Sequence, residues 1–300
     1  MKIIHLQSPL ANPIPNLALC LGFFDGMHIA HQKLFAATIS QKKPTGIMTF
    51  STHIPTFLQN EQYYALTLMA DKIEIANRYG FDYFIILDVS KELVIMEPDQ
   101  FIRQYLVSCA KVIVGFDFRF GHKGSGDALY LKSRLPEQTI IIPEMDFYNK
   151  KVGSTRIRKQ LSLGKISLVN RLLGRKYQIN GVVIKGHGRG KTLGYPTANV
   201  DYNGYYLPKD GVYYTTIRLS DSLYDAMTYI GYNPTFKDGK MALETHIFGL
   251  ERELYDEVIT IYFEKYIRPE MSFSSKEALI AQIKKDESSV HKLIPSRRNI

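Results

Sequence analysis

Short apolar runs alternate with stretches of helical spacing over the first half of the chain. The runs are rich in Val, Ile and Leu, and the stretches between them repeat their apolar positions at a helical period. This alternation predicts an α/β fold with βαβ units and a parallel sheet, whose ligands bind at the carboxyl ends of the strands. The predicted strands are Ile3–Leu6, Leu17–Leu21, Thr45–Phe50, Tyr83–Leu87, Val112–Gly115 and Thr139–Ile142; the predicted helices are Gln32–Ser40, Met69–Tyr79, Asp99–Ser108 and Asp127–Arg134.

The pattern changes after about residue 174, where strands follow one another without helices between them. Turn residues such as Asn233-Pro234 and Asp238-Gly239 separate these runs, which predicts a small antiparallel barrel or sandwich. Ser274 and Glu277 have the spacing of a capping box before a closing helix at Ala278–Lys285. The predicted strands are Tyr177–Lys185, Gly211–Leu219, Tyr224–Ile230, Leu243–Phe248 and Val258–Phe263.

Length and composition fit a soluble protein of two domains. The chain has 300 residues, and Gly153–Leu173 predicts two short helices that end the first domain, so we predict domains at 1–173 and 174–300. Cys20 and Cys109 are too few for a disulfide framework or a zinc cluster, which favours a reducing cytoplasm. We expect no signal peptide and no membrane span, because no apolar run is long enough.

The formal net charge of +9 comes from scattered Lys and Arg residues rather than from a basic block. Scattered charge disfavours a nucleic-acid-binding arm. It leaves open two interpretations, a general contribution to solubility and the binding of small phosphorylated ligands.

Two histidines follow the predicted strand Leu17–Leu21 after a glycine-containing turn. We predict that a helix begins near His28, which places His31 on the same face one turn later. Imidazoles at a helix N-terminus, where free N–H groups favour anions, can form a polyphosphate site. The alternative is a pair of surface histidines on an amphipathic helix.

A second hydroxyl-rich segment precedes the predicted helices that end the first domain. Ser154 or Thr155 can cap the helix, and Arg158 lies one turn further on. Hydroxyls with a guanidinium at a helix start can hold phosphate oxygens. An ordinary capped helix with solvated charges is the alternative.

The most informative stretch is the glycine-rich segment Lys185–Asn199. It is not a Walker loop, because the glycine spacing is one residue short and Gly194 and Pro196 break any following helix. Its glycines still allow the backbone to wrap a phosphate chain. Thr197 and Asn199 lie two apart on one strand face, and their oxygens suit Mg²⁺. A mobile glycine-rich hairpin is the alternative.

Several segments of the first half resemble signatures of the bacterial bifunctional riboflavin kinase/FAD synthetase family. Gly22–His31 resembles G-x-F-D-G-x-H-x-G-H, and Val152–Arg158 resembles I-S-S-T-x-I-R. Val114–Gly121 with Gly126-Asp127 is similar to V-G-x-D-F-x-F-G-x-x-x-x-G-D, and Thr49–His53 is similar to T-F-x-P-H. The resemblance implies a Rossmann-like nucleotidyltransferase domain that adenylylates FMN.

The same resemblance implies the residues of the adenylylation site. Ala30, Gly153 and the pair Ser51-Thr52 depart from the family pattern, so a kinase with a weakened adenylylation site is a rival. The implied ATP-binding residues are Gly22, Asp25, Gly26, His28, His31, His53, Ser154, Thr155 and Arg158, with the two histidines catalytic; the implied flavin-binding residues are Asp117, Phe118 and Arg119.

The second half resembles riboflavin kinases. Gly186–Asn199 resembles G-x-G-R-G-x-x-L-G-[FY]-P-T-A-N; Gly231–Phe236, Glu244–His246, Leu254–Asp256 and Ile267–Phe273 are similar to further family segments. The resemblance implies a barrel kinase domain in which Glu244 is the general base for the ribityl 5′-hydroxyl. It also implies phosphate binding by Gly186, Gly188, Arg189 and Gly190, Mg²⁺ binding by Thr197 and Asn199, and flavin binding by Arg268.

These resemblances predict two ATP-dependent reactions, riboflavin to FMN and FMN to FAD, both with Mg²⁺. The expected partners are ATP, riboflavin and FMN, without nucleic acid or membrane; the sequence does not give the oligomeric state. Two further rivals are a non-catalytic flavin-binding regulator and nucleotidyl transfer to another phosphorylated substrate.

Overall fold

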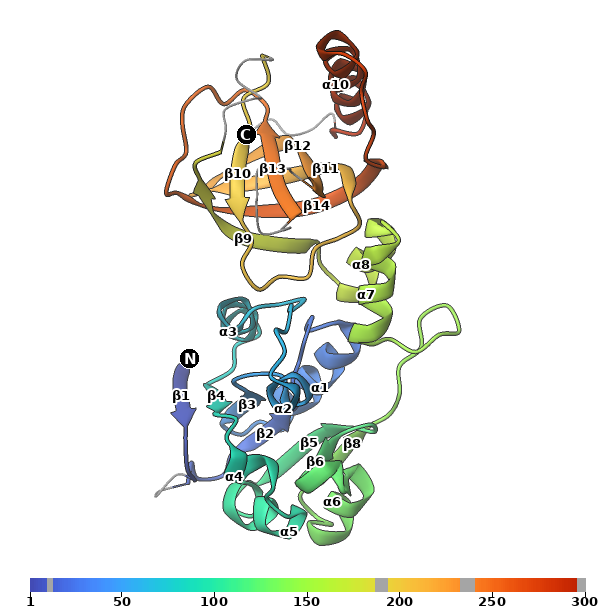
Figure 1. Cartoon of the computed structure of the whole chain (residues 1–300). Coiled ribbons are helices and arrows are strands. Elements are labelled where there is room, and N and C mark those ends of the chain that lie inside the picture. Colours follow the sequence, from blue (N-terminus) through green and yellow to red (C-terminus); the bar gives the residue numbers. More distant parts are fainter. Residues whose placement is uncertain (10–12, 187–193, 233–240, 296–300) are drawn as a thin grey trace. The chain divides into compact units, whose positions relative to one another are not determined.

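The computed structural model describes residues 1–9, 13–186, 194–232 and 241–295. Its contacts divide the chain into two compact units, Met1–Ser154 and Thr155–Ile300 (Figure 1). The predicted boundary between residues 173 and 174 lies later, and it stays a prediction for the functional domains. Within the described residues, no helix is long and apolar enough to cross a membrane.

The N-terminal unit is built on a six-stranded sheet in which every neighbouring pair is parallel. All six predicted strands are confirmed. The strand order is β1 (Lys2–Leu6), β4 (Tyr83–Leu87), β3 (Thr45–Phe50), β2 (Ala18–Leu21), β5 (Lys111–Gly115) and β8 (Thr139–Ile142). The central strand β2 is buried along its whole length, as expected when both faces of a parallel sheet are covered.

Helices cover both faces of this sheet and enclose two apolar cores. Side chains of α1 (Ile29–Ile39) and α3 (Met69–Arg78) pack with Ala18 and Cys20 on one face. Leu19 and Leu21 point to the other face, where they pack with α4 (Lys91–Val94), α5 (Pro98–Phe101), η1 (Ile102–Leu106) and α6 (Ala128–Arg134). The single helix predicted over Asp99–Ser108 is in fact α5 passing into η1, which is a π-helix.

Small elements without a predicted counterpart complete the unit. The helix α2 (Ile54–Gln59) follows β3, and the paired strands β6 (Arg119–Phe120) and β7 (Gly126–Asp127) flank the short 3₁₀ helix η2 (His122–Gly124). These segments are too short to show a periodic pattern of apolar residues, which is why the sequence pattern did not reveal them.

The C-terminal unit contains a closed antiparallel barrel. Of the two predicted architectures, a barrel or a sandwich, the barrel is confirmed. Hydroxyls of Thr215, Thr228 and Thr245 form a buried hydrogen-bonded chain in it, with Oγ1–Oγ1 distances of 2.7 and 3.0 Å. The strand order is β10 (Ala198–Asp201), β13 (Met241–Ile247), β12 (Ser222–Tyr232), β11 (Gly211–Leu219), β14 (Val258–Arg268) and β9 (Tyr177–Ile184), which pairs again with β10.

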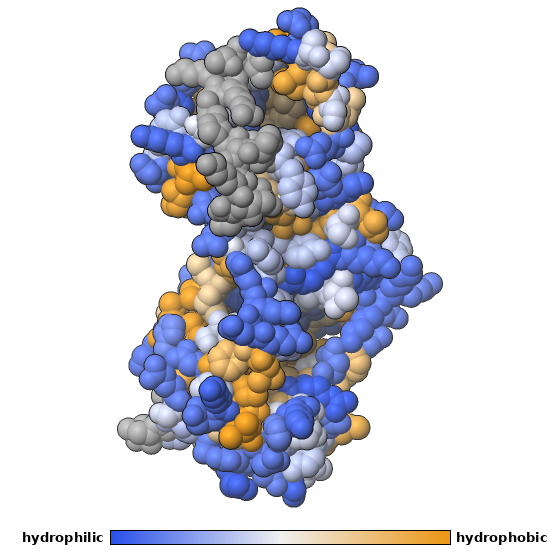
Figure 2. All heavy atoms as spheres, viewed as in Figure 1, coloured by the Kyte–Doolittle hydropathy of each residue, from blue (hydrophilic) through white to orange (hydrophobic). Residues whose placement is uncertain are grey.

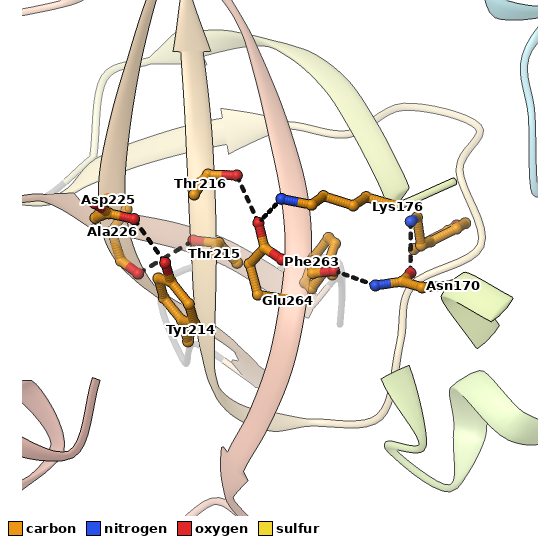
Figure 3. Close-up of polar contacts among 10 residues, drawn as sticks. Asn170, Lys176, Tyr214, Thr215, Thr216, Asp225, Ala226, Phe263 and Glu264 are labelled. Carbon is orange, nitrogen blue, oxygen red and sulfur yellow. Dashed lines mark hydrogen bonds and ion pairs between the residues drawn. The ribbon is translucent and has the colours of Figure 1, made fainter. Parts of the chain in front are cut away.

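Two helices, α7 (Ser154–Ser162) and α8 (Ile166–Leu173), precede the barrel. Asn170 of α8 accepts a hydrogen bond from the Tyr177 backbone N–H (2.8 Å) and donates one to the Phe263 carbonyl (2.9 Å) (Figure 3). Beside it, Lys176 forms an ion pair with Glu264, which also accepts a hydrogen bond from Thr216 at 2.9 Å. These contacts join α8 to the strands on either side of the barrel closure.

The closing helix α10 (Lys276–His291) is longer than predicted, and the predicted cap at Ser274 is wrong. Ser275 is the N-cap, because its Oγ accepts the Ala278 N–H at 3.1 Å. Figure 2 shows mainly hydrophilic residues on the face that it draws, with apolar residues in small separate groups.

Candidate active sites

The first candidate site lies at the carboxyl edge of the parallel sheet. The segment Gly22–His31 follows β2, Ser51–His53 follow β3, and Phe116–Arg119 follow β5. The strand order places β3 and β5 on opposite sides of β2, so the loops after them diverge there. This is the position at which open α/β sheets bind ligands, and it brings three predicted segments to one edge.

His28 and His31 form a stacked pair at the start of α1. His28 is the N-cap, and its Nδ1 accepts the His31 backbone N–H at 3.3 Å. The ring centroids are 3.6 Å apart, and the rings are inclined by 18°. An Nδ1 that accepts leaves the proton of the neutral His28 ring on Nε2, which can then donate to an anion. The predicted helix start is confirmed.

A strained turn leads from β2 to these histidines. Phe24, Gly26 and Met27 have φ values of 53°, 81° and 40°, in the left-handed region that non-glycine residues rarely adopt. At Gly22 an added Cβ would lie 2.9 Å from the Phe24 ring, which packs edge-on against His31. Gly22 and Gly26 therefore shape the turn, and their predicted contact with ATP stays a prediction.

Asp25 is buried inside this turn, with 3% of its surface exposed. Its carboxylate accepts hydrogen bonds from the Leu66 backbone N–H and the Tyr63 hydroxyl, both at 2.8 Å. Ser154 donates to the Asp25 carbonyl at 2.8 Å. Asp25 thus ties the turn to the neighbouring segment, and direct phosphate binding by its side chain stays a prediction.

Sequence reasoning did not single out Tyr63 or Lys72, which contact this turn. Lys72 donates to the Phe23 carbonyl at 2.6 Å, and Thr49 donates to the same oxygen at 3.0 Å. The ring of Tyr63 stacks on His53 with centroids 4.4 Å apart. One feature of the sequence could have revealed Lys72. It lies one helical turn before Ile75 and Ala76, the buried apolar residues of α3, on a helix face where a lysine is unusual.

The segment after β5 divides into exposed and buried residues. Asp117 forms an ion pair with Lys151 at 2.6 Å, and Arg119 contacts Asp127 at 3.5 Å, both near the surface. Phe118 is 9% exposed and stacks on Phe120 in the apolar core. Flavin binding by Asp117, Phe118 and Arg119 stays a prediction.

The hydroxyl-rich segment forms the start of α7. Ser154 and Thr155 are the first two residues of the helix rather than its cap, and Arg158 lies one turn in, over the Tyr206 ring at 4.8 Å. Ser154 belongs to the N-terminal unit, whereas Thr155 and Arg158 belong to the C-terminal unit. A side chain at Gly153 would meet no atom within 4 Å, so the family serine would fit there.

The second candidate site lies on a row of paired residues across three barrel strands. Glu244 of β13 lies opposite Asn199 of β10 and opposite Tyr229 of β12. The Thr197 hydroxyl donates to Glu244 Oε2 at 3.4 Å. At Gly186 a Cβ would overlap the Asn199 amide, so only glycine allows this approach. Four predicted residues thus meet here; Gly188, Arg189 and Gly190 lie outside the described residues.

Neighbouring side chains hold the row in place. His246 Nδ1 lies 2.7 Å from the Pro196 carbonyl, next to Thr197. Tyr229 is hydrogen-bonded to Glu270, and burial together with this carboxylate raises the pKa of the Tyr229 hydroxyl. The first contact holds the residue before Thr197 against β13, and the second holds the neighbour of Glu244 on β12.

Arg268, predicted to bind flavin, anchors the closing helix. Its Nε lies 3.0 and 2.8 Å from the two carboxylate oxygens of Asp286 on α10, and Nη2 lies 2.8 Å from Oδ2. The side chains are 15% and 4% exposed. The guanidinium is thus engaged in a structural ion pair, and its contact with flavin stays a prediction.

The donor set of the second site suits Mg²⁺. Nowhere in the described ranges do three or more His, Cys, Asp or Glu side chains gather as a metal site. A hydroxyl, an amide oxygen and a carboxylate are hard oxygen donors, and Mg²⁺ commonly takes few protein ligands and completes its shell with phosphates and water.

Comparison with known proteins separates the chain into the same two parts. A model of FAD synthetase matches residues 12–156, and a model of riboflavin kinase matches residues 173–294. A bifunctional riboflavin kinase/FMN adenylyltransferase of Listeria monocytogenes is 36% identical over 304 residues, covering 96% of each chain. The chain belongs to the bifunctional riboflavin kinase/FMN adenylyltransferase family. The resemblance inferred from the motifs is confirmed.

Another relative and a solved structure align equally far. The Bacillus subtilis bifunctional riboflavin kinase/FMN adenylyltransferase is 32% identical, again over 96% of each chain. A crystal structure described as a macrolide-efflux protein from Streptococcus pneumoniae is 29% identical, with a TM-score of 0.87, and the alignment covers 97% of this chain and 99% of that one. The two-unit fold is therefore shared along its whole length.

Proposed function

We propose that this chain makes both flavin cofactors. Riboflavin and ATP give FMN and ADP in the C-terminal barrel, and FMN and ATP give FAD and pyrophosphate in the N-terminal unit. The observation that supports this most directly is that Asn199 and Glu244 lie opposite each other on adjacent strands, with Thr197 bonded to Glu244 and Gly186 against Asn199. The matches to both family models support the two activities together.

In the kinase reaction, Glu244 accepts the proton of the ribityl 5′-hydroxyl. The hydroxyl oxygen then attacks the γ-phosphorus of ATP, and ADP leaves. The Thr197 hydroxyl, 3.4 Å from Glu244 Oε2, orients the carboxylate. Mg²⁺ held by the oxygens of Thr197 and Asn199 would neutralise charge on the transferring phosphate.

In the adenylylation reaction, a phosphate oxygen of FMN attacks the α-phosphorus of ATP, and pyrophosphate leaves. This chemistry needs placed positive charge and donors rather than a protein nucleophile. His28 and His31 stack where the α1 N-terminus favours anions, and the donor on His28 Nε2 suits a phosphate oxygen. Ser154, in the same unit, supplies a further polar group for the ATP phosphates. The roles of Thr155 and Arg158 stay predictions.

We place these reactions in the cytoplasm, with small molecules as the partners. Cys20 and Cys109 are buried free thiols, which fits a reducing compartment. Burial raises the pKa of both thiols to about 12, so neither is a reactive thiolate.

The test is chromatography of the products formed with ATP and Mg²⁺, starting once from riboflavin and once from FMN. We expect FMN and FAD from riboflavin, and FAD from FMN. If FMN forms but no FAD appears, even from reduced FMN, the chain is a riboflavin kinase only. Ala30 would then be the first residue to test as the cause of the lost adenylylation. Absence of both products would support the non-catalytic flavin-binding regulator.

A further inference from the structure

A buried lysine lies against the turn that presents the two histidines. Lys72 of α3 is 3% exposed, and its ammonium group contacts Phe23 twice. It donates to the Phe23 carbonyl at 2.6 Å and lies 4.1 Å from the centroid of the Phe23 ring. Burial of a lysine is costly, so lysines inside proteins are usually paired with groups that favour the charge.

The turn that Lys72 contacts has a backbone conformation that is unfavourable for the residues in it. Phe24 and Met27 have positive φ values, a conformation that non-glycine residues keep only where the surroundings hold it. The Phe23 carbonyl accepts hydrogen bonds from Lys72 and Thr49. The Asp25 carboxylate accepts hydrogen bonds from the Leu66 N–H and the Tyr63 hydroxyl. His28, the N-cap of α1, is the next residue after Met27. The short backbone segment Phe23–Met27 therefore connects the Lys72 contact to the histidine pair.

The charge of Lys72 is balanced by the turn. Burial lowers the pKa of the Lys72 ammonium to about 8, and Asp25 acts in the opposite direction. Titratable groups near this turn include Asp25, Tyr63 bonded to it, His53, whose ring centroid lies 5.1 Å from that of Phe23, and Asp71, whose carboxylate accepts the Leu68 N–H. Loss of the proton removes the attraction to the Phe23 ring and to Asp25 while adding no new contact.

We propose that Lys72 is a positioning residue for FMN adenylylation, and that its positive charge holds the Phe23–Met27 turn in the geometry that presents His28 and His31. This inference rests on the proposed adenylylation. It assigns no contact between Lys72 and a substrate. Its direct consequence is that FAD formation depends on the protonation of Lys72, whereas FMN formation by the barrel does not.

The two activities of one chain provide an internal control. Initial rates of FMN formation from riboflavin and of FAD formation from FMN are measured between about pH 6.5 and pH 9.5, a range chosen around the titration of Lys72. In the wild-type chain, kcat for FAD formation should fall with rising pH, with a midpoint near pH 8. FMN formation should lack this decline. Parallel profiles for the two activities would overturn the proposal.

Substitution gives the second arm of the test. Lys72→Met keeps the length of the side chain without its charge, and we expect kcat for FAD formation to fall about 10- to 100-fold, the scale of a small misplacement of catalytic groups. The remaining rate should no longer decline near pH 8. Lys72→Arg keeps a charge that does not titrate, so its profile should stay flat across this range. The matched control is Lys2→Met, at the amino end of β1, which should behave as wild type.

The possible outcomes distinguish failure of the positioning role from failure of the proposed adenylylation. An unchanged rate and pH profile in Lys72→Met would overturn the positioning role. If that variant unfolds, the comparison of the two wild-type profiles decides alone. If wild-type protein forms FMN but no FAD at any pH, the proposed adenylylation fails, and this inference fails with it.

Discussion

At the scale of single residues, the carboxylate of Glu244 is the group that we propose as the base of the kinase reaction. Glu244→Gln keeps the shape of the side chain and removes the proton acceptor. We expect FMN formation to fall by about 10²-fold or more, the usual scale for loss of a general base. FAD formation from supplied FMN should persist. Product chromatography with each substrate measures both, and near-normal phosphorylation of riboflavin would remove Glu244 from this role.

The proposed Mg²⁺ site also requires that residue 186 has no side chain. An added Cβ would overlap the Asn199 amide, so Gly186→Ala should displace one of the two proposed Mg²⁺ ligands. We expect a large rise in the Mg²⁺ concentration that gives half-maximal FMN formation, together with a lower kcat. Gly153→Ala is the control, since its Cβ would meet no atom within 4 Å, and its kinase activity should not change. Equal Mg²⁺ dependence in the two variants would contradict the site.

At the scale of elements, Asn170 joins α8 to the barrel with two hydrogen bonds (Figure 3). Asn170→Ala leaves the Tyr177 N–H and the Phe263 carbonyl without this partner, which should lower the free energy of unfolding of the C-terminal unit by about 1–3 kcal/mol. The comparison is Lys176→Ala, whose ion pair with Glu264 is partly exposed and should contribute about 0–1 kcal/mol. Urea unfolding followed by circular dichroism distinguishes them; similar losses would show that Asn170 is no special link.

Local patterns were sufficient to predict most elements and to mark the segments that form each candidate site. The six parallel strands follow from apolar runs, and the start of α1 follows from the glycine turn before His28. Two further elements depart from local rules. The π-helix η1 has the composition of an ordinary helix, and β10 begins two residues after Pro196 with a sequence, Ala-Asn-Val-Asp, that has only one β-branched residue.

The parts of the site that could not be predicted depend on contacts between distant segments. Lys72 and Phe23 are 49 residues apart in the chain, and Tyr63 and Asp25 are 38 apart. No spacing rule joins such pairs. Arg268 is a further case. The family motif identifies this residue, but the sequence does not show that its ion-pair partner is Asp286.

At the scale of the whole molecule, residues 157–172 of α7 and α8 lie between the two ranges matched by the family models, yet they belong to the C-terminal unit. A fragment of residues 155–300 keeps the bonds of Asn170, whereas a fragment of residues 174–300 loses them. We expect the longer fragment to phosphorylate riboflavin and to unfold cooperatively, and the shorter one to be less stable. Urea unfolding and FMN formation measure this, and equal behaviour would place the functional boundary after α8.

The closure of the barrel has a consequence for how the protein is made. The barrel closes when its first strand, β9, pairs with its last, β14, so a chain leaving the ribosome cannot complete it until late in synthesis. Until then its strands present open edges to other chains. The parallel sheet, by contrast, is complete once β8 has emerged. The half proposed to consume FMN is thus finished before the half proposed to produce it, the reverse of the order in which a flavin molecule would pass through the two reactions.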